Sequence, residues 1–403
     1  MLPIIAKDMN VAQTVFGGWL SGHILNFKNR PQTEAVVMFP HDVQVDGAVE
    51  GIKYYSFGKT DRQQRFEFII ENERPDVVHI FGTENAHSLD AINACIAKNV
   101  IDRTLVSIQG LISVYARHFF AALDPKLYKR KTLRDIIKRS SLKKNRDAFA
   151  RSGKREIEVL KKCKNVIGRT DWDKACVQRI NPEAKYYFCN ESLRSGFYEA
   201  EWSLDRCEKH SIFVSQCSYP IKGFHLMLEA MCDIVKKYPD AHLYTTGSNL
   251  LRSDSKFNHQ KMTYYNYYIK SLIDKYGLKD KVTFLGTLNE EEMKQRYLSS
   301  HVFVLPSSVE NSPNSLGEAM LLGVPCVASD VGGVKNMMTH NEEGYVYPYD
   351  EPYMAAYYIS EIFDNDTLAQ KFSEKAKAHA SHTHNVQINL EKAMEIYEKV
   401  GRN

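Results

Sequence analysis

Short apolar, β-rich segments alternate with helical patterns along almost the whole chain, and this alternation limits the possible folds more than any other feature. Strands are expected at residues 35–39, 53–57, 76–81, 105–108, 166–168 and 186–189, and then at 212–215, 242–245, 282–285, 302–305, 325–328 and 345–347. Strands separated by helices predict parallel sheets with helices on both faces. We therefore expect an α/β protein with two doubly wound, Rossmann-like domains.

The boundary between the two sets of strands is expected near residues 192–210, where serine, glycine, tryptophan and charged residues interrupt the pattern. This predicts an N-terminal domain over residues 1–195, a C-terminal domain over 205–385 and a last helix over 386–403. A chain of 403 residues with 43% hydrophobic residues is large enough for two such domains. Ligands of these folds bind beyond the carboxyl ends of the strands, so we expect the site in the cleft between the domains.

Eight cysteines are scattered along the chain without Cys-x-x-Cys spacing, which argues against a zinc site or a disulfide framework. Reduced thiols in the cytoplasm are expected. We expect neither a signal peptide nor a transmembrane segment, because no apolar run has the required length.

One segment predicts a strand, a loop, a helix and a second strand in succession. The apolar run at 301–305 predicts a buried strand, and Ser312 before Pro313 predicts a helix with serine as its N-cap. The helix is expected to end at Gly323, before a strand at 324–329. Its N-terminus offers backbone N–H groups and a partial positive charge to an anion such as a pyrophosphate.

Two glutamates, Glu310 and Glu318, flank this predicted helix start. With the phosphates bound there, each carboxylate can accept hydrogen bonds from a pair of hydroxyl groups. The natural ligand is a nucleotide sugar, with Glu310 on the hexose and Glu318 on the ribose. The alternative is that both are solvated acids favoured by the helix dipole, since short motifs also occur by chance.

The segment from Phe303 to Gly333, FVLPSSVENSPNSLGEAMLLGVPCVASDVGG, resembles the donor-site signature of glycosyltransferase family 4. The resemblance extends more weakly from Phe16 to the C-terminus. It implies the two-domain GT-B architecture, with the last helix crossing back onto the first domain, and retaining sugar transfer without a cofactor. It also implies contacts from the first glutamate to the transferred sugar and from the second to the ribose. It also implies donor-binding roles for other residues of the loop and helix start, which are Asn311, Ser312, Asn314, Ser315 and Leu316.

Near the start of the chain, Gly17 and Gly18 look like the glycine-rich turn that follows the first strand in this family and lets the backbone approach the donor phosphates. Residues 1–15 contain no apolar run of strand length. We therefore expect that the central first strand is missing, through a misplaced start codon, an engineered truncation or real divergence. The prediction is that codons upstream of Met1 encode a short apolar strand. The alternative for the glycine pair is an ordinary turn.

Lys222 lies in the loop after the strand at 212–215, where the family usually carries an arginine and a lysine that neutralise the diphosphate. The lysine matches, but the arginine's place falls at Gln216 or Cys217. Losing one positioned cation commonly costs about 3 kcal/mol of barrier. Either Arg169 or Arg194 substitutes for it, or turnover is slow.

On the acceptor side, many relatives have a histidine where this chain has Gln109. Glutamine can hydrogen-bond a hydroxyl group but cannot act as a base. The resemblance implies that the leaving phosphate takes the acceptor's proton instead. His79, Glu84 and His87, around the end of the strand at 76–81, are further acceptor-side candidates, and a structural role is the alternative for each histidine.

Two Asp-x-Asp sequences, at 171–173 and 364–366, have the form with which single-domain sugar transferases hold a metal ion. Both are expected near helix starts or in loops, where aspartate is a common cap. Because the helix dipole and Lys222 supply positive charge, we expect no metal.

Residues 126–164 contain sixteen lysines and arginines against four acids, although the whole chain carries only +4. Leu133, Ile136, Ile137 and Leu142 are interleaved with these cations, so part of the segment could form a basic amphipathic helix on an anionic membrane. A solvated helical face is the alternative. Nucleic-acid binding is not expected, because no recognisable motif or stacking platform is present.

The sequence thus predicts a retaining, metal-independent glycosyltransferase. It would move a hexose from a nucleotide diphosphate donor, with UDP expected, to a glycan or lipid-linked saccharide in capsule, exopolysaccharide or lipopolysaccharide synthesis. It is expected in the cytoplasm, peripheral on the inner face of the membrane. The alternative is a nucleotide-sugar-binding scaffold subunit without turnover, because the usual arginine and histidine are replaced. The sugar, the acceptor and the linkage stay open.

Overall fold

The computed structural model describes residues 2–11, 18–28, 30, 33–247 and 262–401, and the chain divides into two compact units. Unit 1 comprises Met1–Leu111, Lys154–Ser195 and Thr383–Asn403, and unit 2 comprises Ile112–Gly153 and Gly196–His382. The sequence assigned all of residues 1–195 to the first domain, whereas Ile112–Gly153 packs within unit 2. Hydrogen bonds hold this segment there, for example from Ser308 Oγ to the carbonyl oxygen of His118 at 3.1 Å.

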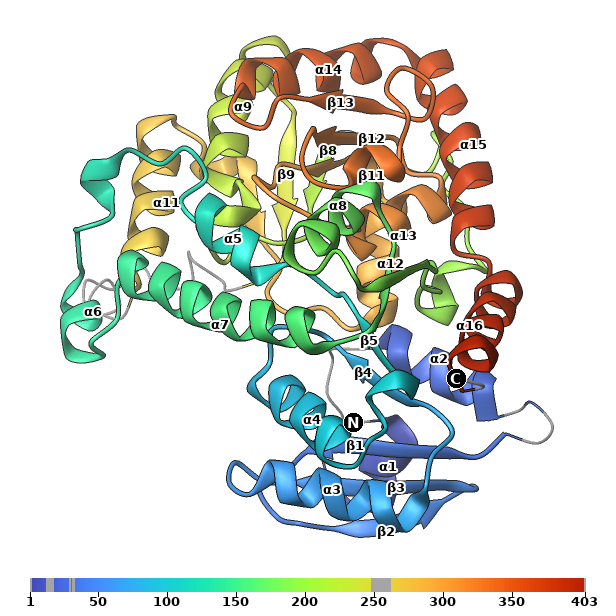
Figure 1. Ribbon diagram of the computed structural model, residues 1–403. Coiled ribbons are helices and arrows are strands. Elements are labelled where there is room, and N and C mark those ends of the chain that lie inside the picture. Colours follow the sequence, from blue (N-terminus) through green and yellow to red (C-terminus); the bar gives the residue numbers. More distant parts are fainter. Residues whose placement is uncertain (1, 12–17, 29, 31–32, 248–261, 402–403) are drawn as a thin grey trace. The chain divides into compact units, whose positions relative to one another are not determined.

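Unit 2 contains a six-stranded parallel sheet in the order β10-β9-β8-β11-β12-β13 (Figure 1). Its strands are β8 (Glu208–Val214), β9 (His242–Thr245), β10 (Val282–Phe284), β11 (Ser300–Leu305), β12 (Cys326–Ser329) and β13 (Tyr345–Tyr347). Every residue of β11 and β12 is buried, as expected for strands covered by helices on both faces. All six strands predicted for the second half of the sequence are present.

The helices of unit 2 are α5 (Ile112–His118), α6 (Leu133–Ile137), the start of α7 (Leu142–Lys162), α9 (Phe224–Lys237), α11 (Tyr264–Lys275), α12 (Glu290–Leu298), α13 (Asn314–Leu322), α14 (Pro352–Asp364) and α15 (Asp366–Thr383). The chain runs from β8 through α9 to β9, and from β11 through α13 to β12. The first connection leads towards the β10 edge of the sheet and the second towards the β13 edge, so the strand order reverses between β8 and β11. Such a reversal is where doubly wound sheets bind their ligands.

Unit 1 contains two sheets within the described residues. One has the order β1-β3-β2, and the other is parallel with the order β4-β5-β6-β7. The strands are β1 (Ala35–Pro40), β2 (Asp46–Val49), β3 (Ile52–Phe57), β4 (Val78–Phe81), β5 (Thr104–Ser107), β6 (Asn165–Gly168) and β7 (Lys185–Phe188). The sequence predicted one continuous sheet here and missed β2, which pairs antiparallel with β3. No described strand joins β1 to β4, so the sheet is divided.

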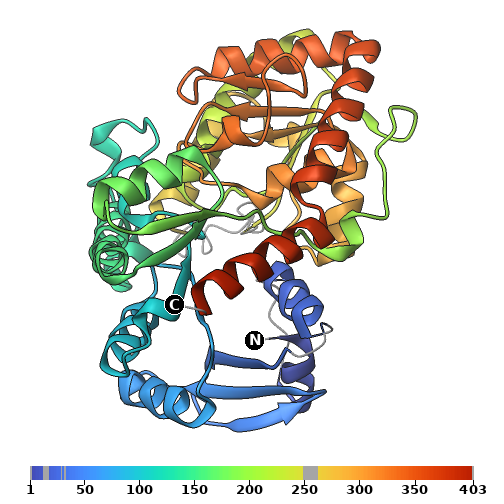
Figure 2. The same ribbon diagram turned by 45° about the vertical axis from the view of Figure 1, so that its right-hand side comes forward.

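The helices of unit 1 are α1 (Pro3–Asp8), α2 (Gly18–Lys28), α3 (Arg62–Glu73), α4 (Ala86–Ala97), the end of α7, α8 (Asp171–Ile180) and α16 (Val386–Gly401). Figures 1 and 2 show α16 beside α2, where the hydroxyl of Tyr397 lies 3.1 Å from His23 Nε2. Ala393, Ile396 and Val400 of α16 pack into the core with Leu105 and Ile167. Among the described residues, no helix combines the length and apolar character needed to cross a bilayer.

Of residues 1–15, Pro3–Asp8 form the short helix α1 and not a strand, in keeping with their lack of a strand pattern. Gly18 begins α2, while Gly17 lies outside the described residues. The expected upstream strand stays a prediction.

Candidate functional site

Three loops of unit 2 meet where the strand order reverses. They follow β8, β11 and β12, and hydrogen bonds join them. The backbone N–H of Ser308 donates to the carbonyl oxygen of Ile221 at 2.8 Å, and Ser329 Oγ donates to the carbonyl oxygen of Ser307 at 2.6 Å. Because the carboxyl ends of these parallel strands share one edge, residues far apart in the sequence come together here.

Lys222 and Glu310 form an ion pair in these loops. Lys222 Nζ lies 2.5 Å from Glu310 Oε1, which also accepts a hydrogen bond from Ser307 Oγ at 2.7 Å. Glu310 is only 5% exposed. Burial lowers the pKa of Lys222, but the negative charge of Glu310 outweighs this and holds that pKa above its usual value. Lys222 therefore keeps its positive charge in a largely dehydrated position.

Two glycines allow the loops to approach this closely. Gly223 has φ +65°, and a Cβ atom there would lie 1.7 Å from the carbonyl oxygen of Pro306. Gly332 has φ +53°, and a Cβ atom there would lie 1.7 Å from the carbonyl oxygen of Glu310. Any side chain at either position would both strain the backbone and push the loops apart.

Helix α13 begins one residue later than predicted. Pro313 is the N-cap and Asn314 the first helical residue, with no side-chain cap, while Ser312 Oγ instead contacts Met337 Sδ at 3.5 Å. Asn314 and Ser315 occupy the first turn, where N–H groups have no acceptor within the helix. The predicted end at Gly323 is confirmed, because its φ of +78° terminates the helix.

Glu318 and Leu316 lie inside α13, and both are buried. The backbone N–H of Asn311 donates a hydrogen bond to the hydroxyl oxygen of Tyr115 at 3.1 Å. Sequence reasoning missed Tyr115, which comes from α5, and it also missed Ser307, although Ser307 lies within the segment that carries the resemblance.

Gln216 stands where the resemblance implies an arginine, and its side chain makes hydrogen bonds with the next two residues. Its Oε1 accepts hydrogen bonds from the backbone N–H groups of Cys217 and Ser218, at 3.1 and 3.2 Å, and from Ser218 Oγ at 2.7 Å. The amide is therefore used within its own loop. The position is electrically neutral.

A second polar cluster lies in unit 1, at the carboxyl ends of β5, β6 and β7. Arg169 Nη1 lies 2.5 Å from Glu191 Oε2, and Gln109 Nε2 donates to Glu191 Oε1 at 2.7 Å. Burial raises the pKa of Glu191, while Arg169 and Gln109 oppose that rise. The structure thus joins two predicted residues, Gln109 and Arg169, through Glu191, which was not predicted. A pocket lined by His23, His79, Phe81, Ser107, Arg169 and Glu191 lies beside the cluster.

Of the other acceptor-side candidates, His79 lines this pocket, where its Nε2 lies 2.6 Å from Ser107 Oγ, whereas Glu84 and His87 are not among the residues that line it. Glu84 precedes α4, and burial raises the pKa of its carboxyl group. The ring of His87 packs 5.3 Å from that of Phe57, and burial lowers the pKa of His87. Arg194 lies in the loop that follows β7.

Both Asp-x-Asp sequences have structural contacts. Asp173 lies in the first turn of α8, where its carboxylate accepts hydrogen bonds from the backbone of Arg169 at 3.0 Å and from the hydroxyl of Tyr186 at 2.5 Å. Asp364 lies 2.5 Å from Lys237 Nζ at the end of α14. Across the described ranges, no three His, Cys, Asp or Glu side chains are grouped to hold a metal ion.

Comparison with known proteins shows that part of this chain is similar to glycosyltransferases. Residues 198–379 match the family model of the glycosyl transferases group 1. An uncharacterised glycosyltransferase of Methanocaldococcus jannaschii is 33% identical over 142 residues, which are 35% of this chain and 32% of that protein. The chain spans at most about half the length of the first curated relatives that it matches, with 49% as the larger share.

Solved structures match over nearly the whole chain. HepE of Anabaena in complex with UDP has a TM-score of 0.66 at 14% identity and covers 96% of this chain and 98% of its own. Sucrose-phosphate synthase of Thermosynechococcus elongatus has a TM-score of 0.64 at 15% identity and covers 91% and 89%. The chain therefore has the GT-B fold, and its residues 198–379 form a glycosyl transferases group 1 domain.

Proposed function

We propose that this protein is a retaining glycosyltransferase of family 4 that transfers a hexose from a nucleotide diphosphate sugar, with UDP as the nucleotide. The observation that carries the proposal is the Lys222–Glu310 ion pair beside the N-terminus of α13, at the strand reversal of a glycosyl transferases group 1 domain. The binding of UDP and UDP-glucose by the structurally similar HepE supports a nucleotide sugar as the donor.

In this proposal the diphosphate binds to the N–H groups of Asn314 and Ser315 and to the ammonium of Lys222. These groups supply the positive charge that stabilises a departing diphosphate. Asn311, Ser312 and Leu316 shape the loop and helix around it. Glu318 binds the ribose, and Glu310 binds the hydroxyl groups of the hexose. The glycine pair at 17–18 contributes backbone contacts to the phosphates.

On the acceptor side, Gln109 is proposed to hydrogen-bond a hydroxyl group, with Glu84 and His87 as further candidates. No side-chain base is assigned, since the leaving phosphate takes the proton of the acceptor on the same face of the sugar. Arg169 is a stronger candidate than Arg194 for a substitute cation. Its guanidinium pairs with the carboxylate of Glu191, which also accepts a hydrogen bond from Gln109. The negative charge of Glu191 offsets the positive charge of Arg169, so Lys222 is proposed to supply most of the positive charge to the diphosphate.

The proposed acceptor is a glycan or lipid-linked saccharide, and the proposed setting is capsule, exopolysaccharide or lipopolysaccharide synthesis at the inner face of the cytoplasmic membrane. Transfer is proposed to need no metal ion, because Lys222 and the start of α13 supply the charge that a metal would.

A nucleotide-sugar-binding subunit without turnover is the second candidate. It is favoured by Gln216, whose neutral side chain is bound within its own loop where a second cation is expected. Both candidates require donor binding, and only the first requires chemistry.

Thermal unfolding with a panel of nucleotide sugars and free nucleotides tests donor recognition. Each tenfold excess of a bound ligand over its dissociation constant adds about 1.4 kcal/mol of stability. A Glu318→Gln variant should lose most of this stabilisation for every nucleotide sugar, whereas Glu374→Gln, an exposed position on α15, should keep it. Absence of any shift with all nucleotide sugars would contradict the proposal.

A further inference from the structure

The short helix α6 turns its apolar side chains outward. Leu133, Ile136 and Ile137 are 50%, 61% and 69% exposed, whereas Asp135 of the same helix is 2% exposed. A surface helix of a globular protein normally buries its apolar residues and exposes its acids. Three large aliphatic side chains on one exposed turn indicate a surface that another apolar phase covers.

Hydrogen bonds fix α6 in this inverted orientation. The carboxylate of Asp135 accepts from the backbone N–H of Tyr264 at 2.8 Å and from Ser140 Oγ at 3.0 Å. Thr132 forms a capping box with Asp135, and its hydroxyl donates to the carbonyl oxygen of Met262 at 2.7 Å. The buried acid is therefore satisfied by partners in unit 2, and turning the helix over would break all of these bonds.

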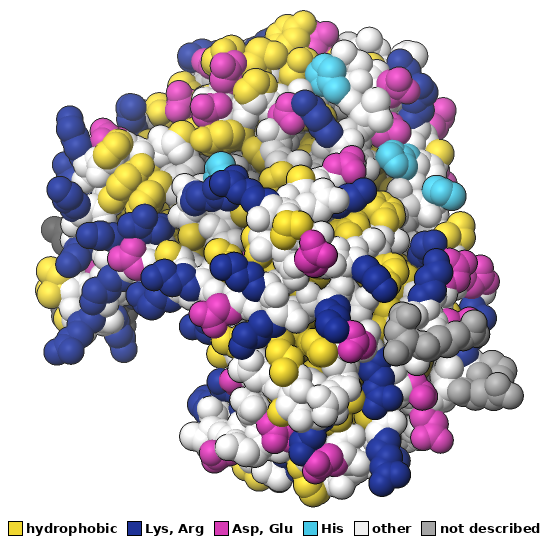
Figure 3. All heavy atoms as spheres, viewed as in Figure 1, with side chains coloured by type: hydrophobic (Ala, Val, Ile, Leu, Met, Phe, Trp, Pro, Cys, Tyr) yellow, Lys and Arg dark blue, Asp and Glu magenta, His cyan; other side chains and the backbone are white. Residues whose placement is uncertain are grey.

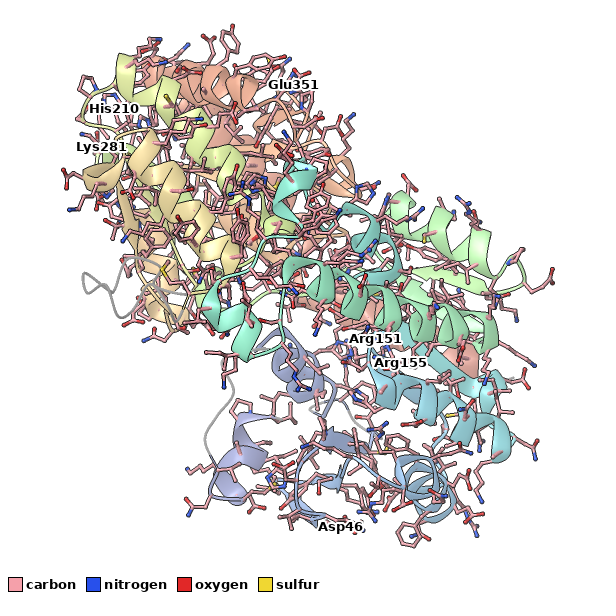
Figure 4. All side chains as sticks on the ribbon, turned by 90° about the vertical axis from the view of Figure 1, so that its left-hand side faces the viewer. Asp46, Arg151, Arg155, His210, Lys281 and Glu351 are labelled. Carbon is pink, nitrogen blue, oxygen red and sulfur yellow. The ribbon has the colours of Figure 1, made fainter. Side chains whose placement is uncertain are left out.

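Positive charge surrounds the exposed aliphatic residues. Figure 3 shows lysine and arginine side chains gathered over α6 and α7 at its left. Figure 4 is turned by 90° so that this left-hand side faces the viewer, with Arg151 and Arg155 labelled along α7. Eight cations of residues 126–144 are exposed, and within the described part of the chain none of them is paired with a carboxylate. They are Lys126, Lys129, Arg130, Lys131, Lys138, Arg139, Lys143 and Lys144.

We propose that residues 126–144, here called the basic tip, bind the surface of an anionic lipid bilayer. Leu133, Ile136 and Ile137 enter the boundary between headgroups and acyl chains, while the surrounding cations contact anionic headgroups. The charges are complementary, and aliphatic side chains suit the acyl region. Nucleic acid fits less well, because single strands bind through aromatic stacking and the exposed apolar residues of the tip are aliphatic.

The basic tip differs from the amphipathic helix expected from the sequence. Leu142 was expected to join the apolar face, but it is buried at 5% exposure and begins α7. The apolar contribution comes instead from the five-residue helix α6. The inference goes beyond sugar transfer, because bilayer binding is measured without a donor or acceptor, so either can fail while the other holds.

Sedimentation with lipid vesicles tests the proposal on the full-length protein. Vesicles of pure phosphatidylcholine are compared with vesicles that contain 30% phosphatidylglycerol, at about 0.05 M and 0.5 M salt. Wild-type protein should sediment with the anionic vesicles at low salt, and far less with neutral vesicles or at high salt. Absence of sedimentation with anionic vesicles at low salt would overturn the proposal.

Matched variants separate the two parts of the basic tip. Ile136→Asn with Ile137→Asn should weaken binding at least about tenfold, since buried aliphatic carbons are lost. Lys138→Glu with Arg139→Glu should weaken it by about fivefold or more for each cation. The control Lys279→Glu with Lys371→Glu changes two exposed lysines elsewhere in unit 2 and should bind like wild type.

Equal loss of binding in the control would show that net charge alone acts, and unchanged binding of the isoleucine variant would show that no apolar insertion occurs. Either outcome contradicts the proposal. So would tighter binding to a single-stranded oligonucleotide than to anionic vesicles at the same salt. All changed residues are exposed, and circular dichroism confirms that each variant is folded.

Discussion

Lys222 and Glu310 lie 88 positions apart in the chain, yet their charged groups meet at 2.5 Å where the strand order of unit 2 reverses. The pair joins the loop after β8 to the loop after β11. Each residue alone is an ordinary loop residue. Together they place a cation and a carboxylate in the loops near the start of α13, and the proposed donor site depends on this arrangement.

Replacing Lys222 by methionine should affect stability and activity together. It leaves the buried carboxylate of Glu310 without its counter-ion, so the free energy of unfolding should fall by about 1–3 kcal/mol. This is less than for a fully buried pair, because the side chain of Lys222 is 22% exposed. Catalysis should fall about 100–1000-fold. Denaturant unfolding and initial rates measure the two effects.

The double variant Lys222→Met with Glu310→Gln should regain most of the lost stability but none of the lost activity. A double variant that regains activity would contradict the assigned role of the cation.

Gly332→Ala should destabilise the loop that carries Glu310. The new Cβ atom would lie 1.7 Å from the carbonyl oxygen of Glu310, at a φ of +53° that alanine adopts only with strain. The free energy of unfolding should fall by more than about 1 kcal/mol. Gly58→Ala is the control, since no atom lies within 4 Å of its added Cβ, and its unfolding free energy should change little. Equal stabilities of the two variants would refute the steric argument.

Tyr115→Phe should raise KM for the donor with little change in kcat. It removes the acceptor of the Asn311 N–H, a bond of 3.1 Å that positions the residue after Glu310. The expected loss of stability is about 1 kcal/mol. Tyr267→Phe, at an exposed tyrosine of α11, should leave the kinetics unchanged. A fall in kcat alone would argue against a positioning role.

His225 should make the protein less stable as the pH falls from about 6.5 towards about 4. It is buried against the hydroxyl of Tyr265 and the carbonyl oxygen of Ala121, and burial lowers its pKa to about 4. Above pH 6.5 the ring is neutral in both states. Between the two values the unfolded chain binds the additional proton, so stability is lost on acidification, by about 3 kcal/mol for this residue.

Urea unfolding at pH 4.5 and 7.5 measures this dependence. A His225→Gln variant should show a smaller difference between the two pH values than wild type. An identical difference would exclude His225 as a contributor.

Removal of divalent ions should not change transfer. Initial rates with and without a chelator should agree, because Lys222 and the start of α13 supply the positive charge in the proposed mechanism. Activity that a chelator abolishes and that Mg²⁺ or Mn²⁺ restores would contradict this.

The alternation of apolar and helical patterns predicted twelve strands, because a short apolar, β-rich run indicates a buried strand from neighbouring residues alone. The antiparallel strand β2 was missed, since Asp46–Val49 is half exposed and carries no apolar run. The start of α13 was misplaced by one residue, because Ser312 is a good cap in isolation while tertiary contact draws its hydroxyl to Met337.

The partners of site residues were harder to predict than the residues themselves. Tyr115 meets Asn311 across 196 positions, and only the packing of α5 within unit 2 brings them together. Glu191 follows β7 with no motif around it, although it links Gln109 to Arg169. Contacts of this kind depend on tertiary structure, which residue spacing does not encode.

The most direct test of the account is the release of UDP from UDP-hexoses, in the presence and absence of saccharide acceptors. Wild-type protein and Glu374→Gln should release UDP at equal rates, and Glu310→Gln should be at least about 100-fold slower while remaining folded. Equal rates for wild type and Glu310→Gln, or no release by wild type with any nucleotide sugar that it binds, would contradict the proposal that this site transfers sugar.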